Sequence, residues 1–547
     1  MDTQPCKVLK PEYEKDAIQP GIVHFGPGNF FRGHLAVIID RYMDHTGDHR
    51  WGITGVTLHD PEKAEKLARQ GFNYHVAERD SDTCVIREIR SLKNILHAPS
   101  DRQAVIDLIA SPETKLVTMT ITQKGYVTPE GGFEPGDPQT VADYLVHALQ
   151  KRRMREQAQA EQDAAQSGTT DVFNAAATSE SQPTLKNLFA DAAAPSPMIG
   201  GVAVNKKAGL TLMSCDNIPD NGTELKKAVL ARAAYFAGLP EWIEEKVSFP
   251  DTMVDRIVPA TREEDVLWLK ERFGIDDSLA IFTEPFRQLV IQRRFSGEFP
   301  NLEYKGDDAK NRGILILDKM SDYELMKIRM LNGTHFALGL AGTLAGYTYI
   351  DEALKDPDIR EFAQSFMREA ANSLRPIEGV DYDDYRERNF KRFVNPHMKD
   401  ELVRLARNGS DKLRPRCLAI VRDLRDKGMP YRHMALVAAA WSHYIKGING
   451  KGEQFDILDD KAAKQDWPHL ARKLSDIARD QRTGGQILAE MQSIFEDDLA
   501  RDPAFHHAFG YYHSLIGRHG VQYAMREVDN PVVQMFPAGQ HHRFKIA

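Results

Sequence analysis

The stretch that most constrains the fold is GIVHFGPGNFFRGHLAVIIDRYMDHTG, residues 21–47. A short apolar strand, Ile22 to Phe25, runs into the turn Gly26-Pro27-Gly28, and a helix with apolar periodicity follows. This combination suits a pyrophosphate, because the free amides of a helix start and a close backbone approach both favour one. The dinucleotide fingerprint has a third glycine where this chain has Phe31, so an ordinary βα turn is the alternative.

A second predicted strand, GITGVTL at residues 52–58, ends in His59-Asp60. In a Rossmann unit, an acidic residue at this place binds the hydroxyls of the adenosine ribose. Asp60 also suits the N-cap of the following helix, because Pro61 stands at a first-turn position. The two roles are compatible, and both agree with a dinucleotide-binding domain.

Further strands are predicted beside this unit. Residues 72–79 and 84–92 have the composition of an antiparallel pair next to the main sheet. The run KLVTMTIT, 115–122, has the apolar pattern of a buried strand and ends before Gln123-Lys124. Because the carboxyl ends of strands in an open α/β sheet face the ligand, the end of this run is predicted to lie near the nicotinamide.

The segment LTLMSCDNIPDNG, 210–222, predicts a strand that ends at Asp216-Asn217. Asn217 either forms an Asx turn or presents its amide to a substrate oxygen. The segment 249–259 predicts a further strand, and 281–295 predicts a strand pair. With them, the Rossmann-type NAD-binding domain is predicted to span residues 1–300.

Residues 151–196 interrupt this pattern. They are rich in alanine, glutamine, serine, threonine and charge and poor in bulky apolar side chains, so they cannot bury much apolar surface. We predict a surface insertion that is helical at first and then partly disordered, and that holds no functional site.

The composition narrows the class of protein. A chain of 547 residues predicts two or more domains, and a net charge of −8 argues against nucleic acid or an anionic membrane as a partner. The four cysteines are scattered, which predicts neither a disulfide framework nor a structural zinc site. The first residues contain no apolar signal core and no run of about 18 apolar residues occurs, so a cytoplasmic location is expected.

The residues with the clearest chemistry lie in SDYELMKIRMLNGTHFALGLAG, residues 321–342. At about 100° per residue, Lys327, Asn332 and His335 fall within an arc of roughly 140° on one helix face. A lysine base, an amide that donates to a carbonyl oxygen and an imidazole that binds a second hydroxyl form a proton-transfer site. The plainer alternative is a surface lysine, a cap-like Asn-Gly and a buried core histidine.

The surroundings of this stretch are predicted to be helical. Ser321 and Glu324 have capping-box spacing, which marks a helix start. Helical periodicity recurs through residues 301–547, which we assign to a mainly α-helical substrate-binding and catalytic domain. Because the chemical residues follow directly on the join between the two domains, the site is expected between them.

Several motifs occur in a fixed order along the chain. They are G-I-V-H-F-G-x-G-N-F-x-R-x-H, M-T-I-T-x-x-G-Y, S-C-D-N-x-x-x-N-G, V-D-R-I-x-P, E-P-F-x-Q and K-x4-N-x2-H, and R-F-x-N-P-x-x-x-D precedes an N-G-S-x-K segment. In these motifs the chain resembles the polyol-specific long-chain dehydrogenase/reductases, the group that includes mannitol 2-dehydrogenases and the fructuronate and tagaturonate reductases. The resemblance covers nearly the whole chain outside the insertion.

The resemblance implies hydride transfer without a metal. Lys327 would be the general base, and His335 would bind and orient the polyol. Asn217 and Asn332 would hold the developing alkoxide or carbonyl oxygen. A lysine in a largely closed cleft has its pKa lowered by desolvation, which suits a base near neutral pH.

The resemblance also implies binding residues. Substrate contacts are expected from Asp255, Arg404 and Lys412. Cofactor contacts are expected from the glycine turn, the helix start and two strand ends, that is from Gly26, Gly28, Asn29, Phe30, Arg32, Asp60 and Thr122. Asp60 favours NAD over NADP, and NADP stays open because no second acid precedes it.

The sequence therefore predicts an NAD-dependent oxidoreductase that interconverts a polyol and a ketose, with D-mannitol and D-fructose as the foremost pair. Within the family the alternative is a hexuronate reductase, whose substrate carboxylate would need a cation such as Arg404, Lys412 or Lys124. Outside it, the alternative is a nucleotide-binding regulator that has lost catalysis. The expected oligomeric state is a monomer or a weak homo-oligomer.

Overall fold

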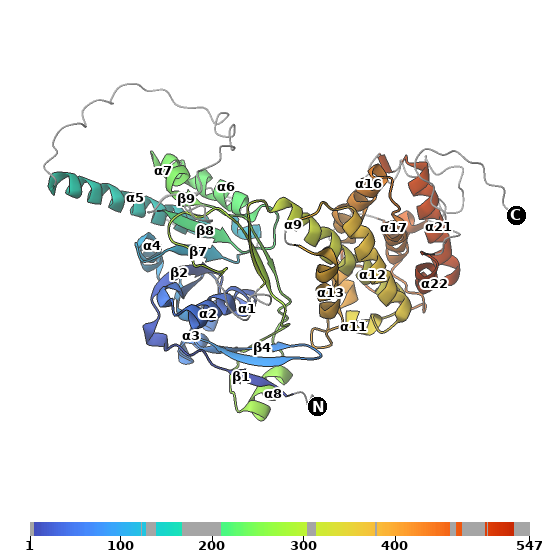
Figure 1. Ribbon diagram of the computed structural model, residues 1–547, viewed down its shortest axis with the longest axis horizontal. Coiled ribbons are helices and arrows are strands. Elements are labelled where there is room, and N and C mark those ends of the chain that lie inside the picture. Colours follow the sequence, from blue (N-terminus) through green and yellow to red (C-terminus); the bar gives the residue numbers. More distant parts are fainter. Residues whose placement is uncertain are drawn as a thin grey trace, which may run out of the picture. The chain divides into compact units, whose positions relative to one another are not determined.

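The computed structural model describes residues 5–121, 123–126, 138–166, 209–303, 313–377, 380–459, 466–472, 498–499 and 501–529. They belong to two compact units, Met1–Met320 and Ser321–Ala547. The first unit combines sheets and helices, and the second is built of helices (Figure 1). This confirms the predicted α/β half followed by a mainly helical half.

A six-stranded parallel sheet forms the centre of the first unit. Its order is β6-β3-β2-β7-β8-β9, which reads 3-2-1-4-5-6 along the chain, the order of doubly wound dinucleotide-binding domains. The strands are β2 (Pro20–Phe25), β3 (Gly52–Thr57), β6 (Leu92–His97), β7 (Leu116–Met119), β8 (Leu210–Ser214) and β9 (Val247–Ser248).

Helices cover both faces of this sheet (Figure 1). Adjacent residues of β2 enter different cores: Ile22 packs in the core that contains α2 (Leu35–Thr46), and Val23 packs in the one that contains α5 (Val141–Gln166). Because both faces are covered, β3 is buried at every position. The other helices of this unit are α1 (Asn29–Gly33), α3 (Pro61–Arg69), α4 (Arg102–Ala110), α6 (Asn221–Ala233), α7 (Leu239–Lys246) and α8 (Glu263–Phe273).

Two smaller sheets complete the first unit. One has the order β1-β5-β4-β11, with β1 (Lys7–Leu9), β5 (Cys84–Ile89), β4 (Tyr74–Arg79) and β11 (Ile281–Thr283). The other has the order β10-β12-β13, with β10 (Thr252–Asp255), β12 (Gln288–Gln292) and β13 (Ile314–Leu317). The predicted antiparallel pair is confirmed as β4 and β5.

The predicted strand pair at 281–295 is wrong as a pair, because its two strands join different sheets. β11 pairs with β4, whereas β12 pairs with β10 and β13. The connection between them cannot close a hairpin, since Glu284 is bound elsewhere. Its carboxylate accepts the Ile257 N–H at 2.6 Å, and its carbonyl oxygen accepts the Arg256 guanidinium at 2.8 Å.

The ends of two predicted segments also differ. The division between the units lies after Met320 rather than at about residue 300, because β13 pairs with β12 and so stays with the first unit. The helix expected at the start of the insertion is present, but α5 begins earlier, at Val141, and its first turns are buried in the core. The part of the insertion predicted to be partly disordered, after residue 166, lies outside the described residues.

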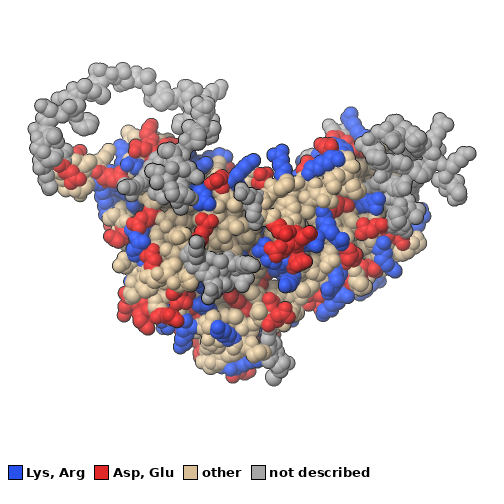
Figure 2. All heavy atoms as spheres, viewed as in Figure 1, with Lys and Arg blue, Asp and Glu red and all other residues tan. Residues whose placement is uncertain are grey.

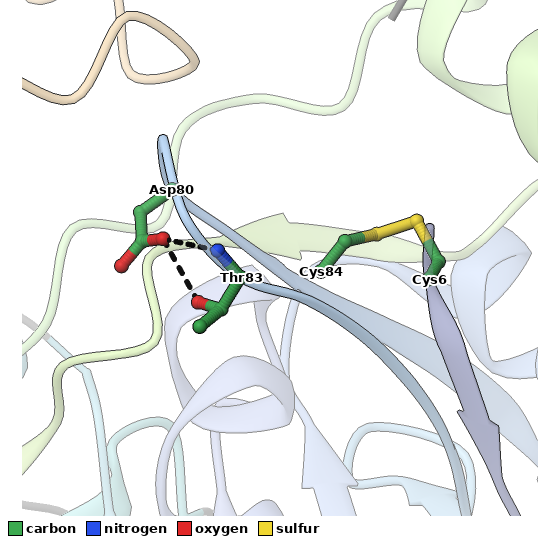
Figure 3. The surroundings of a disulfide bond; sticks show 4 residues. All are labelled: Cys6, Asp80, Thr83 and Cys84. Atoms are coloured by element: carbon green, nitrogen blue, oxygen red, sulfur yellow. Dashed lines mark hydrogen bonds between the residues drawn. A yellow bond between two sulfur atoms is a disulfide. The ribbon is translucent and has the colours of Figure 1, made fainter. Parts of the chain in front are cut away.

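One disulfide joins Cys6 to Cys84, although the scattered cysteines predicted no disulfide framework (Figure 3). The two residues are 78 apart in sequence, but the parallel pairing of β1 with β5 sets Lys7 beside Val85 and so makes the cysteines neighbours. Spacing along the chain cannot reveal this contact, because the sheet creates it. Disulfides are rare in cytosolic proteins, so the cytoplasmic location stays a prediction.

The second unit packs its helices around α10 (Gly333–Leu344) and α17 (Arg432–Tyr444), which are almost entirely buried. A Cβ on Gly339 would come within 2.7 Å of the Ala406 nitrogen, so α10 and α14 approach closely at this glycine. The other described helices are α9 (Ser321–Met326), α11 (Ile350–Ala353), α12 (Pro357–Asn372), α13 (Tyr382–Phe393), α14 (Leu402–Ala406), α15 (Gly409–Leu413), α16 (Ala419–Asp426), α21 (Pro503–His519) and α22 (Val521–Arg526).

On the face shown in Figure 2, basic and acidic side chains are intermixed over the described residues. Within the described parts of the chain, no helix combines the length and the apolar character that crossing a bilayer requires.

Candidate active site

The glycine turn after β2 has the backbone geometry that close ligand approach requires. Gly26 has φ +82°, and a Cβ there would lie 2.3 Å from the Thr120 carbonyl oxygen, so only glycine fits. Gly28 is the N-cap of α1, and a Cβ on it would meet nothing closer than 3.9 Å. The turn therefore keeps open space at Gly28, next to the first amides of the helix.

A buried histidine, His24, stabilises this turn through hydrogen bonds. The His24 ring stacks on Phe31 with 3.5 Å between centroids, and its nitrogens lie 2.7 Å from Thr118 Oγ1 and 3.1 Å from Thr120 Oγ1. Burial lowers the pKa of His24 to about 3, so the ring is neutral and can both donate and accept. Thr120 Oγ1 also donates to the Gly26 carbonyl at 2.8 Å. Sequence analysis missed this network, whose one signal is a histidine within an apolar strand.

The helix after the turn is shorter than predicted. α1 ends at Gly33, and α2 begins at Leu35 after a break at His34. Within α1, the Arg32 guanidinium is buried and donates to the Leu279 carbonyl at 2.6 Å and to Asn29 Oδ1 at 2.8 Å. Arg32 thus braces the helix start through its side chain, and its predicted cofactor contact gains no support from this position.

Phe30 and Thr122 complete the predicted cofactor residues. The Phe30 ring is partly buried and stacks on His34 at 5.0 Å. Thr122 lies outside the described residues, and Thr120 from the same segment contacts the glycine turn instead.

A cavity of about 200 Å³ opens beside the turn. Asp60 lies on its wall as the N-cap of α3: Oδ1 accepts the Lys63 N–H at 3.0 Å, and Oδ2 pairs with Lys63 Nζ at 3.1 Å. The backbone hydrogen bond from Lys63 lowers the pKa of Asp60, so the carboxylate is charged. The capping role is confirmed, and the ribose role remains a prediction. The cavity is lined by Gly26, Pro27, Gly28, Thr57, Asp60, Lys63, Ala64, Ile95 and Thr120.

These features fit a dinucleotide. The cavity joins a glycine turn, open backbone space and an acidic side chain at the carboxyl ends of β2 and β3, where such cofactors bind in this sheet order. Gly26, Gly28 and Asp60 are the described residues best placed to hold one.

The loop after β8 and the strand β10 each carry one residue of the predicted site. Asn217 is exposed in the loop after β8, and Asp255 is the last residue of β10. Buried Asn221 joins the loop after β8 to the start of β10: its Nδ2 donates to the carbonyls of Asp216 and Thr252 at 2.9 and 3.0 Å, and its Oδ1 accepts the Thr252 N–H at 2.8 Å. Sequence analysis missed Asn221, although it belongs to the motif that supplied Asn217.

In the second unit, two of the predicted catalytic residues, Lys327 and Asn332, lie on a π-helical turn, η5 (Lys327–Asn332), and His335 follows on α10. The Gly333 N–H donates to the Ile328 carbonyl, five residues back, in place of the usual four. A π-turn rotates less per residue than an α-helix, so the arc calculated at 100° per residue does not apply. Lys327 and Asn332, five residues apart, lie closer to the same face than predicted. Such turns occur frequently at functional sites.

The plainer alternative for these residues does not hold. Lys327 is only 6% exposed, so it is not a surface lysine. Asn332-Gly333 is not a cap, because the helix continues into α10 with helical angles at both residues. His335 is partly exposed rather than a core residue, and its ring tilts against Phe393 with 4.6 Å between centroids.

A second π-turn, η6 (Arg414–Leu418), packs against the first. A Cβ on Gly333 would lie 3.1 Å from the Arg416 carbonyl oxygen and 3.2 Å from the Phe366 ring, so glycine permits the close approach. Arg416 Nη1 also reaches the Asn332 carbonyl at 3.4 Å. The two turns thus contact each other at Asn332 and Gly333.

The two predicted cations of the substrate end have different surroundings. The Arg404 side chain is 61% exposed, and its Nε donates to Asp400 Oδ1 at 2.8 Å. Lys412 on α15 is half-buried, and its Nζ donates to the Leu405 carbonyl at 3.1 Å. Burial, with nearby arginines, lowers the pKa of Lys412 to about 8.

Two family models match the chain. The mannitol dehydrogenase Rossmann domain matches residues 20–161 and 197–304, and the mannitol dehydrogenase C-terminal domain matches residues 319–515. The mannitol 2-dehydrogenase of Aspergillus fumigatus is 34% identical over 504 residues, which cover 90% of each chain. The chain belongs to the mannitol dehydrogenase family. This confirms the resemblance found in the sequence.

Two solved polyol dehydrogenases share the fold. A D-sorbitol dehydrogenase in substrate-free form is 27% identical, with a TM-score of 0.76 over 95% of this chain and 98% of that one. The mannitol 2-dehydrogenase of Pseudomonas fluorescens, solved with NAD and D-mannitol, is 29% identical, with a TM-score of 0.67 over 95% and 96%. Membership makes the chain an NAD-dependent oxidoreductase that acts on CH–OH groups.

Proposed function

We propose that this chain interconverts a polyol and a ketose, with D-mannitol and D-fructose as the substrates. The support from its relatives is that two at 33% and 34% identity are mannitol 2-dehydrogenases and that the mannitol 2-dehydrogenase of Pseudomonas fluorescens was solved with NAD and D-mannitol. The observation that carries the proposal is the π-turn, which presents a buried lysine and an amide on one segment, three residues before a partly exposed histidine. NAD, held by Gly26, Gly28 and Asp60, supplies the hydride acceptor when bound.

Lys327 is assigned the proton. During oxidation its neutral amine takes the proton of the reacting hydroxyl, and during reduction its ammonium returns a proton to the oxygen. The burial of Lys327 favours this role, because removal from water disfavours the charged ammonium relative to the neutral amine.

We assign the reacting oxygen of the substrate to two asparagine amides. Its other hydroxyls are assigned to other side chains. Asn332, and Asn217 of the first unit, donate to the oxygen as it gains negative charge, which stabilises the transition state more than the alcohol. His335 binds a neighbouring hydroxyl. Further hydroxyls are assigned to Asp255, Arg404 and Lys412. With a lysine for the proton and amides for the oxygen, the step needs no metal.

The test is a panel of polyols with NAD and of ketoses and keto-uronates with NADH, each repeated with NADP(H) and followed by the absorbance of the reduced cofactor. D-Mannitol and D-fructose are expected to give the highest kcat/KM among the neutral compounds. A folded protein that binds NADH but turns over no compound would identify a regulator without catalysis instead.

A further inference from the structure

A phenol group joins two segments of the first unit at the carboxyl ends of β7 and β8. It belongs to Tyr126, the last residue of a short 3₁₀-helix, η3 (Gln123–Tyr126), which follows β7. The Tyr126 hydroxyl donates to Asp216 Oδ2 at 2.5 Å and lies 2.6 Å from Ser214 Oγ. Ser214 and Asp216 are 0% and 6% exposed, so these bonds form away from water, where a hydrogen bond to a carboxylate is strong.

Asp216 is fixed through both its side chain and its backbone. Besides the phenol, its Oδ2 accepts the Ile121 N–H at 3.2 Å, and its carbonyl accepts Asn221 Nδ2 at 2.9 Å. That carbonyl belongs to the peptide that joins Asp216 to Asn217, so this peptide cannot rotate without breaking the bond from Asn221. A buried residue therefore sets the direction in which the backbone enters the exposed Asn217.

The phenol serves here as a donor. Burial, and after it the charge of Asp216, raises the pKa of Tyr126 above its ordinary value. The hydroxyl thus stays protonated in the neutral pH range and keeps its proton for the carboxylate. Proton transfer to the substrate does not suit such a group, but holding Asp216 in place does.

We propose that Tyr126 is a positioning residue, which acts through Asp216 to hold the Asn217 amide in place for the reacting oxygen. This inference rests on the proposed function, in which that amide donates to the oxygen as it gains negative charge. A donor that is already in place stabilises this charge most, because it does not have to reorganise during the reaction. Without the phenol, the buried carboxylate loses a donor, and the peptide before Asn217 shifts as the carboxylate recovers one.

The experiment is a double-mutant cycle of Tyr126→Phe with Asn217→Ala, assayed with NADH and the ketose or keto-uronate of highest kcat/KM. Tyr126→Phe removes only the hydroxyl and should lower kcat about 10- to 100-fold, the cost of misplacing a reacting group by about 1 Å. The KM of the substrate and the Kd of NADH should stay within about threefold, because the amide acts mainly in the transition state. Asn217→Ala should lower kcat about 10²- to 10³-fold.

The cycle separates positioning from general damage. In the Asn217→Ala background, Tyr126→Phe should change kcat by less than about threefold, because the amide that it positions is gone. Tyr144→Phe is the matched control. It removes another buried hydroxyl of the first unit, which donates to the Ala98 carbonyl at 2.9 Å, and should leave kcat unchanged.

Two outcomes overturn the inference alone: Tyr126→Phe keeps the wild-type kcat while Asn217→Ala loses it, or Tyr126→Phe lowers kcat equally in both backgrounds. If Tyr126→Phe does not fold, Asp216→Asn replaces it in the cycle. Its uncharged acceptor weakens the bond from the phenol, so kcat should fall about three- to tenfold, and only where Asn217 is present. A wild-type kcat in Asn217→Ala, or no turnover of any compound, refutes the proposed function, and the inference falls with it.

Discussion

The glycine turn of the first unit offers backbone atoms to its ligand, whereas the π-turn of the second unit offers side chains. At Gly26 the absence of a Cβ allows a positive φ. At Gly28 it leaves open space at the helix start. The segment Lys327–Asn332 instead contributes an amine and an amide from its side chains. It lies on a helix in which the backbone hydrogen bond spans five residues instead of four.

This difference predicts different sensitivities. A site made from backbone is damaged by added atoms, whereas a site made from side chains is damaged by removed ones. Cofactor binding and catalysis should therefore be separable by substitution.

The largest effect is expected from Lys327→Ala. Turnover should fall about 10²- to 10⁴-fold, the usual worth of a positioned general base, while NADH binding measured by fluorescence should survive. Lys391→Ala, which removes an exposed lysine from α13, is the control and should change neither quantity.

The pH profile gives the same substitution a second readout. Wild-type polyol oxidation should rise with pH and then level off, because the amine form of the base becomes dominant. In Lys327→Ala this rise should disappear, and an added primary amine should restore part of the rate. Near-wild-type turnover with an unchanged profile would eliminate Lys327 as the base and favour His335.

Gly26→Ala, by contrast, should weaken NADH binding and lower the stability of the protein. Its Cβ would lie 2.3 Å from a backbone oxygen at a residue with φ +82°, so the free energy of unfolding should fall by about 1–3 kcal/mol. NADH binding should weaken by about tenfold, because the displaced turn would fit the cofactor less well. A loss of about 1.4 kcal/mol in binding free energy raises Kd tenfold. Urea unfolding and NADH fluorescence measure the two effects.

Two other glycines serve as controls for Gly26. Gly47→Ala has φ +70° with nothing within 4 Å, so it measures the conformational cost alone. Gly28→Ala has room for its Cβ and should fold normally. If Gly28→Ala also binds NADH normally, the close approach of the cofactor to this turn is contradicted.

Asp60→Asn tests the one charged side chain that the backbone site uses. The amide keeps an oxygen for the cap of α3 but removes the charge that repels a 2′-phosphate, and it releases Lys63 Nζ, which lies 3.1 Å from Asp60. The ratio of kcat/KM for NADPH to that for NADH should rise about three- to tenfold. Glu62→Gln, an exposed neighbour, should leave the ratio unchanged. A wild type that already prefers NADPH would refute the role of Asp60.

The smallest effect is expected from the insertion, which lies between the glycine turn and the π-turn in the sequence. Replacing residues 167–190 with a short Gly/Ser linker should keep kcat within about threefold, since the composition of this segment cannot bury much apolar surface. The family model also leaves 162–196 unmatched. A replacement that begins at Arg152 should instead destabilise the protein, because Arg152 donates to the carbonyls of Ser111 and Thr114, each at 3.2 Å. Loss of activity in a folded 167–190 variant would show that the segment takes part in the function.

Local patterns in the sequence determined much of the first unit. The turn at Gly26, the cap at Asp60, the buried strands and the antiparallel pair β4–β5 each follow from residues within a few positions of one another. The motif around Lys327 likewise located the chemical segment on a helix. Such features are predictable because their physical cause, a positive φ, a cap or an apolar period, acts over a short range.

Only the tertiary structure decided the rest. The disulfide of Cys6 with Cys84 exists because β1 pairs with β5, and β11 and β12 part because Glu284 is bound by residues 256–257. The π-turn at Lys327 meets a second π-turn at Gly333, where the Arg416 guanidinium donates to the Asn332 carbonyl. These contacts join residues from 27 to more than 80 positions apart. Their energies depend on which surfaces meet, which no local period in the chain encodes.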